Sequence, residues 1–248
     1  MPLGDQETLK VCFEKYSDKI ACVIIEGVPA NNGLLIQTKE FMHEIQNLCK
    51  VNGSLFILDE VITGFRIGYK GAREYYDISP DIVTFGKIIG GGLPVGAYAG
   101  KKHIMNYISP LGNMYQAGTL SGNPLVMVAG NANFDVIESN KNFYQELEEN
   151  TSYIRSELLS LFQQADNPVS IPYMASILWL VYQDQPPKNP KEISKTAIDF
   201  YSKLHSKALK TGIYLPPSAF EVWFLSIAHS KTIIDETITK LKKTLLEG

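Results

Sequence analysis

Residues 54–66 read SLFILDEVITGFR and residues 81–99 read DIVTFGKIIGGGLPVGAYA, and these two stretches decide the fold. Each contains a continuous apolar run that ends in a charged residue, Asp59 in the first stretch and Lys87 in the second. Continuous apolar runs of this length are typical of strands that are buried on both faces of a parallel sheet. Ligands of such sheets bind beyond the carboxyl ends of the strands, so Asp59 and Lys87 are the first candidates for a functional site.

The rest of the first half follows the same pattern. Further apolar runs occupy Ala21–Glu26 and Val95–Ala99. Between the first run and Leu55, the segment Thr38–Asn52 carries apolar residues at the spacing of one helix face. Strands that alternate with helices in this way predict an α/β fold, with a mostly parallel sheet flanked by helices.

The texture changes near residue 137, where a long polar helical region begins. Apolar strand-like runs follow at 177–181 and 221–228, separated by a helical stretch, and the last helix is expected from about residue 232 to residue 246. We therefore predict a large domain over residues 1–137 and a small C-terminal α+β domain over residues 138–248.

Composition excludes several classes of protein. The chain has 248 residues, with 23 Lys and Arg against 26 Asp and Glu, a net charge of −3. A general nucleic-acid binder carries a basic excess, and none is present. No apolar run reaches the length of a membrane span, so we expect no membrane partner. Three scattered cysteines and the absence of a basic, apolar leader at the start predict a cytoplasmic location and no metal site.

Three features carry chemistry: Asp59, Lys87 before the glycine triplet 90–92, and the small and hydroxyl residues around Gly118-Thr119. Taken singly, Asp59 has a structural explanation as a cap, Lys87 as a solvated lysine, and the glycine triplet as a relief of steric crowding. Together they match one cofactor. Pyridoxal phosphate (PLP) needs a sheltered lysine, an anionic partner for its ring nitrogen, and amides and hydroxyls for its phosphate.

Four blocks of the chain resemble the class III aminotransferases, a PLP-dependent family of fold type I. The blocks are LDEVITGFR at 58–66, PDIVTFGKIIGGGLPVGAY at 80–98, MYQAGTLSGNP at 114–124 and GIYLPPSAFEVWFLSIAH at 212–229. The first two blocks are similar to the family as a whole. The last two resemble its aminomutase branch, whose members move an amino group within one substrate.

The resemblance implies roles for several residues in the cofactor domain. Lys87 is implied to form the Schiff base with PLP and to move the proton. Asp59 is implied to pair with the pyridinium nitrogen, and Val61 to pack on the ring face. Asn31 lies where the family places a polar contact to the ring oxygen. Here Gly27 replaces the proline that the family carries after Glu26, so the backbone entering this turn differs from the family pattern.

The resemblance also implies a second subunit and a substrate. Gly118 and Thr119 are implied to bind the phosphate of the neighbouring subunit in a homodimer. Glu221 lies where the aminomutase branch places an active-site acid. The implied reaction converts the amino aldehyde (S)-4-amino-5-oxopentanoate into 5-aminolevulinate, a tetrapyrrole precursor, through the PLP and pyridoxamine phosphate forms of the cofactor.

The family pattern also contains an N-terminal part that this sequence does not show. That part carries a phosphate loop, an aromatic residue that stacks on the ring, and strands of the large sheet. We therefore expect an open sheet edge and an exposed apolar face. Two alternatives stay open: a class III aminotransferase acting between two substrates, and a truncated or split chain that is inactive without the missing N-terminal half.

Overall fold

The computed structural model describes residues 1–16 and 18–246, and the chain divides into two compact units. Unit 1 comprises residues 1–28 and 36–141, and unit 2 comprises residues 29–35 and the chain from Asn142 onward. This division differs from the predicted one in two ways. Helix α5 (Pro124–Ser139) continues past residue 137, which moves the division to Lys141. The short segment 29–35 leaves the first unit and packs with the second.

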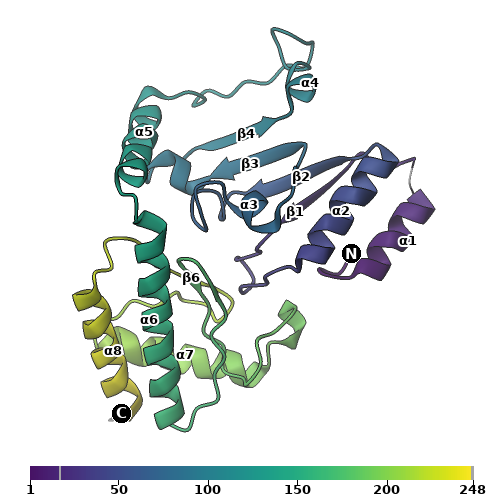
Figure 1. Cartoon of the computed structure of the whole chain (residues 1–248). Helices are drawn as coiled ribbons and strands as arrows, with labels where there is room; N and C mark the ends of the chain where they lie inside the picture. Colours follow the sequence, from purple (N-terminus) through teal and green to yellow (C-terminus); the bar gives the residue numbers. More distant parts are fainter. Residues whose placement is uncertain (17, 247–248) are drawn as a thin grey trace. The chain divides into compact units, whose positions relative to one another are not determined.

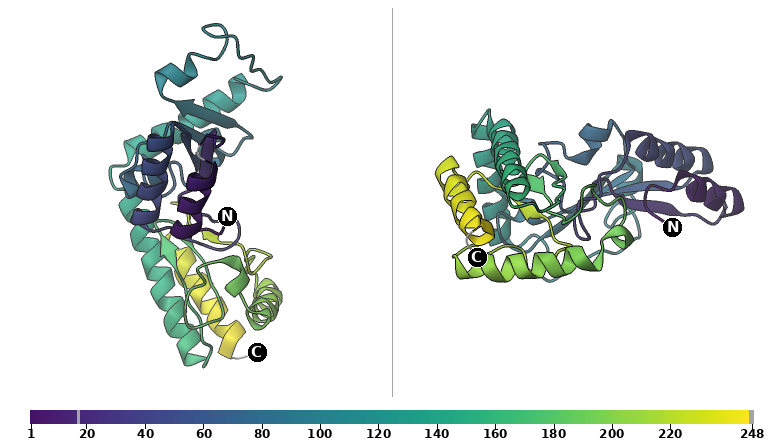
Figure 2. Two further views of the ribbon diagram at one scale, coloured as in Figure 1. Left: turned by 90° about the vertical axis from the view of Figure 1, so that its right-hand side faces the viewer. Right: turned by 90° about the horizontal axis from the view of Figure 1, so that it is seen from below.

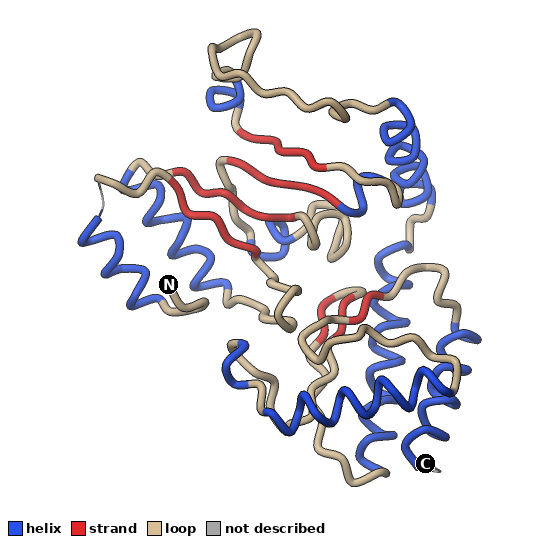
Figure 3. The backbone as a smooth tube through the Cα atoms, turned by 180° about the vertical axis from the view of Figure 1, so that it is seen from behind, coloured by secondary structure: helices blue, strands red, loops and turns tan. Residues whose placement is uncertain are grey.

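Unit 1 is built on a four-stranded sheet in the order β1-β2-β3-β4 (Figure 1). The strands are β1 (Cys22–Glu26), β2 (Leu55–Glu60), β3 (Ile82–Gly86) and β4 (Gly96–Gly100). The first three are parallel, and β4 runs antiparallel to β3. Figure 3 shows the four strands side by side. The mostly parallel sheet with flanking helices confirms the predicted α/β fold.

Helix α2 (Lys39–Asn52) shows how local sequence sets these elements. The hydroxyl of Thr38 accepts a hydrogen bond from the amide of Phe41, which caps the first turn. Gly53 ends the helix in the left-handed conformation, at φ 69°. The helix buries one apolar face in unit 1 and packs beside α1 (Gln6–Tyr16). The expected boundaries of this helix agree with the structure to within one residue.

The outer strands of the sheet are more exposed than continuous apolar runs predict. Every residue of β4 is exposed, and Ile24 of β1 is 60% exposed. The inner strands contain no exposed residue: β2 alternates between half-buried and buried residues, and β3 has two buried and three half-buried residues. The prediction of burial on both faces is therefore wrong for β1 and β4, because these strands form the two edges of the sheet. The expectation of an open edge and an exposed apolar face agrees with this arrangement.

The remaining elements complete the two units. In unit 1 they are α3 (Ala72–Tyr76), the 3-10 helix η1 (Lys87–Gly90), α4 (Lys102–Met105) and α5. Unit 2 contains α6 (Phe143–Gln164), β5 (Tyr173–Met174), β6 (Ile177–Leu178), the 3-10 helix η2 (Pro190–Glu192), α7 (Lys195–Lys210), β7 (Trp223–Phe224) and α8 (Lys231–Leu246). None of the helices in the described parts of the chain combines the length and apolar character needed to cross a membrane.

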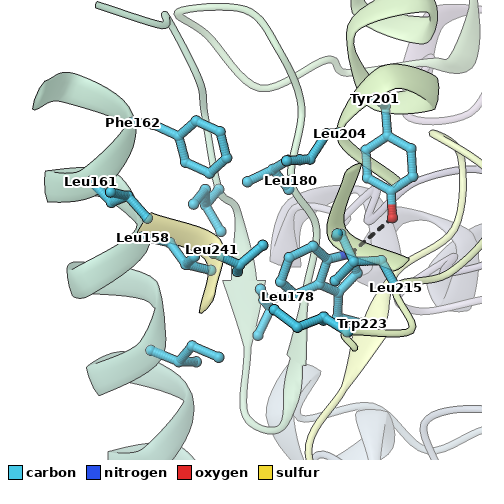
Figure 4. Close-up of a cluster of buried hydrophobic side chains, with 14 of the residues drawn as sticks. Leu158, Leu161, Phe162, Leu178, Leu180, Tyr201, Leu204, Leu215, Trp223 and Leu241 are labelled. Atoms are coloured by element: carbon cyan, nitrogen blue, oxygen red, sulfur yellow. Dashed lines mark hydrogen bonds between the residues drawn. The ribbon is translucent and has the colours of Figure 1, made fainter. Parts of the chain in front are cut away.

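Unit 2 packs its helices against a small antiparallel sheet in the order β5-β6-β7. Its strands have two residues each, so the predicted strands at 177–181 and 221–228 are much shorter in the structure. Helix α8 packs against both α6 and α7 (Figure 2). The core between them includes Leu158, Phe162 and Trp223 (Figure 4). Side chains from three helices and the sheet supply this core, which explains why such short strands persist.

A buried carboxylate anchors the connection after β2, and its removal gives our first prediction. Glu60 is 1% exposed and accepts hydrogen bonds from the amides of Ala72 and Arg73, each at 3.0 Å, and from the Thr63 hydroxyl. Glu60→Ala leaves these buried donors without partners. We expect the free energy of unfolding, measured by urea denaturation, to fall by about 3 kcal/mol.

The matched control is Glu74→Ala on helix α3. The Glu74 side chain is 55% exposed and pairs with Lys70, so its loss should change the free energy of unfolding by at most about 0.5 kcal/mol. Equal losses for the two variants would contradict the anchoring role of Glu60.

Candidate active site

The carboxylate of Asp59 is held at the carboxyl end of β2. In the parallel register Asp59 lies opposite Thr84 of β3, and the Thr84 hydroxyl donates to Asp59 Oδ1 at 3.0 Å. The amide of Val61 donates to the same oxygen at 2.9 Å. Both of these hydrogen bonds end on Oδ1, and no described residue donates to Oδ2. The carboxylate is therefore oriented through one oxygen, and the other is available to a ligand.

Lys87 directly follows β3, the strand next to β2, and so lies at the same carboxyl end of the sheet as Asp59. Strand β3 ends at Gly86, and Lys87 begins η1 with a left-handed backbone, at φ 49°. A Cβ atom on Gly86 would lie 3.3 Å from Cγ1 of Val61, so the Val61 side chain packs against the residue that precedes Lys87. Asp59, Val61 and Lys87 therefore lie at the carboxyl ends of two adjacent parallel strands, where ligands of such sheets bind.

The sheltered environment expected for Lys87 is absent from this structure. Lys87 is exposed, whereas the cofactor chemistry predicts a sheltered, partly desolvated lysine. Lys87 lies in the turn between β3 and the glycine triplet 90–92. Its exposure depends on which segments cover this turn, and within the described part of the chain its side chain is left exposed.

Gly91, in the glycine triplet after Lys87, packs directly against α5 within unit 1. A Cβ atom on Gly91 would lie 2.3 Å from the carbonyl oxygen of Ala129 in α5, and one on Gly130 would lie 2.4 Å from that of Ile89. The side-chain amide of Asn133 also donates to the Ile88 carbonyl at 2.9 Å. The backbones of η1 and α5 therefore touch directly. For Gly91, the steric explanation that the sequence left open is the one that the structure supports.

Gly118 and Thr119 lie in the exposed loop that leads into α5. Gly118 lines an open cavity of about 960 Å³ whose walls are mostly apolar and include Phe65, Phe85 and Phe134. Lys87 and Asp59 are not among the residues that line this cavity. Gly118 therefore shares this cavity with Phe85 and Ile89, which lie on either side of Lys87 in the chain, but not with Lys87 or Asp59 themselves.

Asn31 and Glu221 both belong to unit 2. Asn31 is exposed in the segment 29–35, and Glu221 is half-buried in the loop before β7. The two loops adjoin each other, because the amide of Gly33 donates to the carbonyl of Phe220 at 2.6 Å. The structure therefore brings these two predicted site residues into one loop cluster.

Thr84 is a site residue that the sequence did not single out. Its hydroxyl orients Asp59, yet it lies inside the motif already quoted around Lys87. The available signal was strand alignment, since a parallel neighbour places the residue three before Lys87 next to Asp59. Finding Thr84 required the register of the two strands, which a single sequence leaves undetermined.

Comparison with known proteins gives the class of this chain. Residues 4–245 match the family model for class-III aminotransferases, and the chain belongs to that family. A curated relative from Thermosipho africanus (strain TCF52B), named glutamate-1-semialdehyde 2,1-aminomutase, is 43% identical over 248 residues. The match covers 99% of this chain and 58% of the relative. The chain thus spans little more than half the length of that relative.

Solved structures share the fold. An omega-transaminase from Sphaerobacter thermophilus matches 99% of this chain and 56% of its own, with a TM-score of 0.91 and 24% identity. A glutamate-1-semialdehyde aminomutase from Pseudomonas aeruginosa PAO1, solved in complex with PMP, matches 98% of this chain and 55% of its own, with a TM-score of 0.83 and 19% identity. At these identities the likeness concerns the fold alone.

Proposed function

We propose that this chain carries the PLP site of a glutamate-1-semialdehyde 2,1-aminomutase, which converts (S)-4-amino-5-oxopentanoate into 5-aminolevulinate. The observation that carries the proposal is the convergence of Asp59, Val61 and Lys87 at the ends of β2 and β3. The aminomutase relative, similar over nearly the whole chain, supports the choice of substrate within the family.

The residues around Asp59 fit the cofactor ring. Oδ2 of Asp59, which accepts no hydrogen bond from the described residues, is the acceptor that a protonated ring nitrogen needs. The Val61 side chain, already packed on Gly86, presents an apolar surface for a flat ring. Lys87 follows Gly86 directly and is exposed, so its amine is accessible to a cofactor. The family resemblance adds Asn31 of unit 2 as a proposed polar contact to the ring oxygen. When bound, PLP supplies an electron sink for the substrate carbon.

Two side chains carry the proposed chemistry of the chain itself. Lys87 binds the cofactor covalently and then moves a proton, a step for which a positioned amine is suited. Glu221 binds and orients the substrate. Across the whole reaction the C4 amine and C5 carbonyl of the substrate are replaced by a C5 amine and a C4 carbonyl. The water released at C5 balances the water consumed at C4. The product is therefore an isomer of the substrate, and no other amino donor is consumed.

A second copy of the chain completes the proposed enzyme. The loop that contains Gly118 and Thr119, together with the start of α5, exposes large apolar side chains. The exposed fractions are 84% for Tyr115, 74% for Leu120, 68% for Leu125 and 66% for Val128. Apolar surface of this kind favours a protein interface. If a second copy binds at this surface, Gly118 and Thr119 of one chain can contact the phosphate of a cofactor that is bound to the other chain. We propose a cytoplasmic homodimer.

We therefore predict that Val128→Glu shifts the chain from dimer to monomer, because the variant would bury a charge at the interface. Light scattering after size exclusion at micromolar concentration measures the mass. Val51→Glu is the control, since Val51 is 73% exposed at the end of α2, away from α5. Both variants remaining dimeric, or both becoming monomeric, would contradict an interface at α5.

The proposed function is tested by adding PLP to the purified chain and recording absorbance before and after borohydride reduction. We expect a new band that borohydride converts into a stable adduct, found by mass spectrometry on the peptide that holds Lys87. The semialdehyde is then supplied with no second amino donor, and 5-aminolevulinate is measured. A folded chain without the adduct would overturn autonomous function. Product formed only with an added donor would identify a two-substrate aminotransferase.

A further inference from the structure

We infer that Trp179 is a positioning residue that holds the loop of Asn31 and the loop of Glu221 together as one body. The inference rests on the proposed function for what the two loops do, and on contacts within unit 2 for how they are held. These contacts involve the indole N–H, the indole ring and one glycine.

The first contact joins Trp179 to the Glu221 loop. Trp179 follows β6, and its side chain is fully buried, with 0% exposure. Its indole Nε1 donates to the carbonyl of Ala219 at 2.9 Å. That carbonyl lies two residues before Glu221. The bond therefore fixes the backbone just ahead of the proposed substrate-binding acid.

The second contact joins Trp179 to the Asn31 loop. A Cβ atom on Gly33 would lie 2.4 Å from the indole ring, so the Gly33 backbone rests directly on that ring. Gly33 also has φ 91°, a conformation that favours glycine. Its amide donates to the Phe220 carbonyl at 2.6 Å. The ring thus lies beneath a loop that is itself bonded to the Glu221 loop.

The contact between Gly33 and Trp179 matters because of the course of segment 29–35. Segment 29–35 connects β1 to α2, both of unit 1, yet it packs with unit 2. The amide of Leu35 donates to the Pro29 carbonyl at 2.9 Å and closes the segment into a compact loop. Asn31 therefore belongs to the same compact unit as Glu221. A proposed contact to the cofactor and a proposed contact to the substrate are then set by the same tryptophan.

Trp179→Phe tests the inference because it removes the N–H and keeps an aromatic ring. The matched control is Trp223→Phe, the same change at the other tryptophan of the chain, which is also buried and donates to the Tyr201 hydroxyl at 3.2 Å. Hydrogen exchange is measured on the full chain without cofactor, over peptides that cover 29–35 and 217–222.

We expect Trp179→Phe to speed exchange in both peptides by about tenfold, the factor that corresponds to one buried hydrogen bond. Trp223→Phe should lower thermal stability and leave exchange at 29–35 unchanged. A change in one loop only, in neither loop, or to the same extent in both variants would overturn the inference. Should Trp179→Phe not fold, Gly33→Ala tests the same contact from the other side and should loosen both loops.

The affinity for PLP provides a second measurement. A residue with a purely structural role would not give the non-additive losses that we expect. Asn31→Ala and Trp179→Phe should each lower the affinity for PLP. The double variant should bind PLP as tightly as the single variant with the lower affinity. Additive losses would overturn the positioning role. If the unaltered chain does not bind PLP, the proposed function fails, and the exchange data still decide whether Trp179 couples the two loops.

Discussion

Lys87→Ala is expected to abolish the borohydride-stable attachment of PLP and to lower turnover by about 10⁴-fold, the upper range for a positioned proton-transfer group. The amine is the nucleophile and the proton carrier in the proposed reaction, and the other residues at the strand ends cannot replace it. Asp59 is a carboxylate already bonded to Val61 and Thr84, and Val61 is apolar. Mass spectrometry of the reduced protein measures the first effect, and product formation measures the second.

Lys101→Ala is the control for this experiment. Lys101 follows β4, and because β4 is antiparallel to β3 it lies beside Asp81, at the opposite end of β3 from Lys87. Its loss removes one exposed ion pair and should leave PLP attachment intact. Non-covalent PLP binding should also survive in Lys87→Ala, since Asp59 and Val61 remain. An adduct of unchanged yield in Lys87→Ala would place the reactive amine elsewhere.

Asp59→Ala is expected to lower turnover by roughly 10²–10³-fold, the cost of losing one preorganised electrostatic partner. The loss has two parts, because Asp59 both bonds the ring nitrogen and keeps it protonated in the proposed site. Asp59→Asn separates them: an amide oxygen can still accept from the Val61 amide and the Thr84 hydroxyl, but the negative charge is gone. We expect Asn to restore thermal stability and to restore little turnover.

Asp81→Ala is the matched control for Asp59→Ala. Asp81 accepts from the Phe56 amide at 2.8 Å and pairs with Lys101 at 2.7 Å, at the amino end of β3. Burial acts to raise the pKa of this carboxyl, but the hydrogen bonds from Lys101 and from the Phe56 amide together outweigh burial, and the pKa is lowered. Removing Asp81 should lower stability and leave PLP affinity unchanged. If Asp81→Ala weakens PLP binding as much as Asp59→Ala, the loss reflects the sheet as a whole, and the assigned role of Asp59 is wrong.

The placement of Asp59 and Lys87 was predictable because it depends on short-range features. A buried strand is recognised from a continuous apolar run, and the residue after the run must lie at the end of the strand. Thr38 and Gly53 delimit helix α2 for equally local reasons of capping and backbone conformation. These signals lie within a few residues of one another, so tertiary context has little opportunity to override them.

The partner of Asp59 and the exposure of Lys87 were not predictable in this way. Thr84 reaches Asp59 only through the register of two strands, and register is set by the packing of the whole sheet. The exposure of Lys87 depends on which segments cover a turn. The glycine triplet after it was grouped with the features that carry chemistry, yet Gly91 meets the backbone of α5, a contact that depends on how a later helix packs.

By itself, the sequence determined the α/β fold, the strand ends that carry Asp59 and Lys87, and the family of the chain, because each depends on apolar periodicity or on a contiguous motif. Only the tertiary structure decided that segment 29–35 joins unit 2. That outcome depends on the fit between Gly33 and the ring of Trp179, residues far apart in the chain. Such a contact depends on shape in three dimensions, and residue order does not record shape.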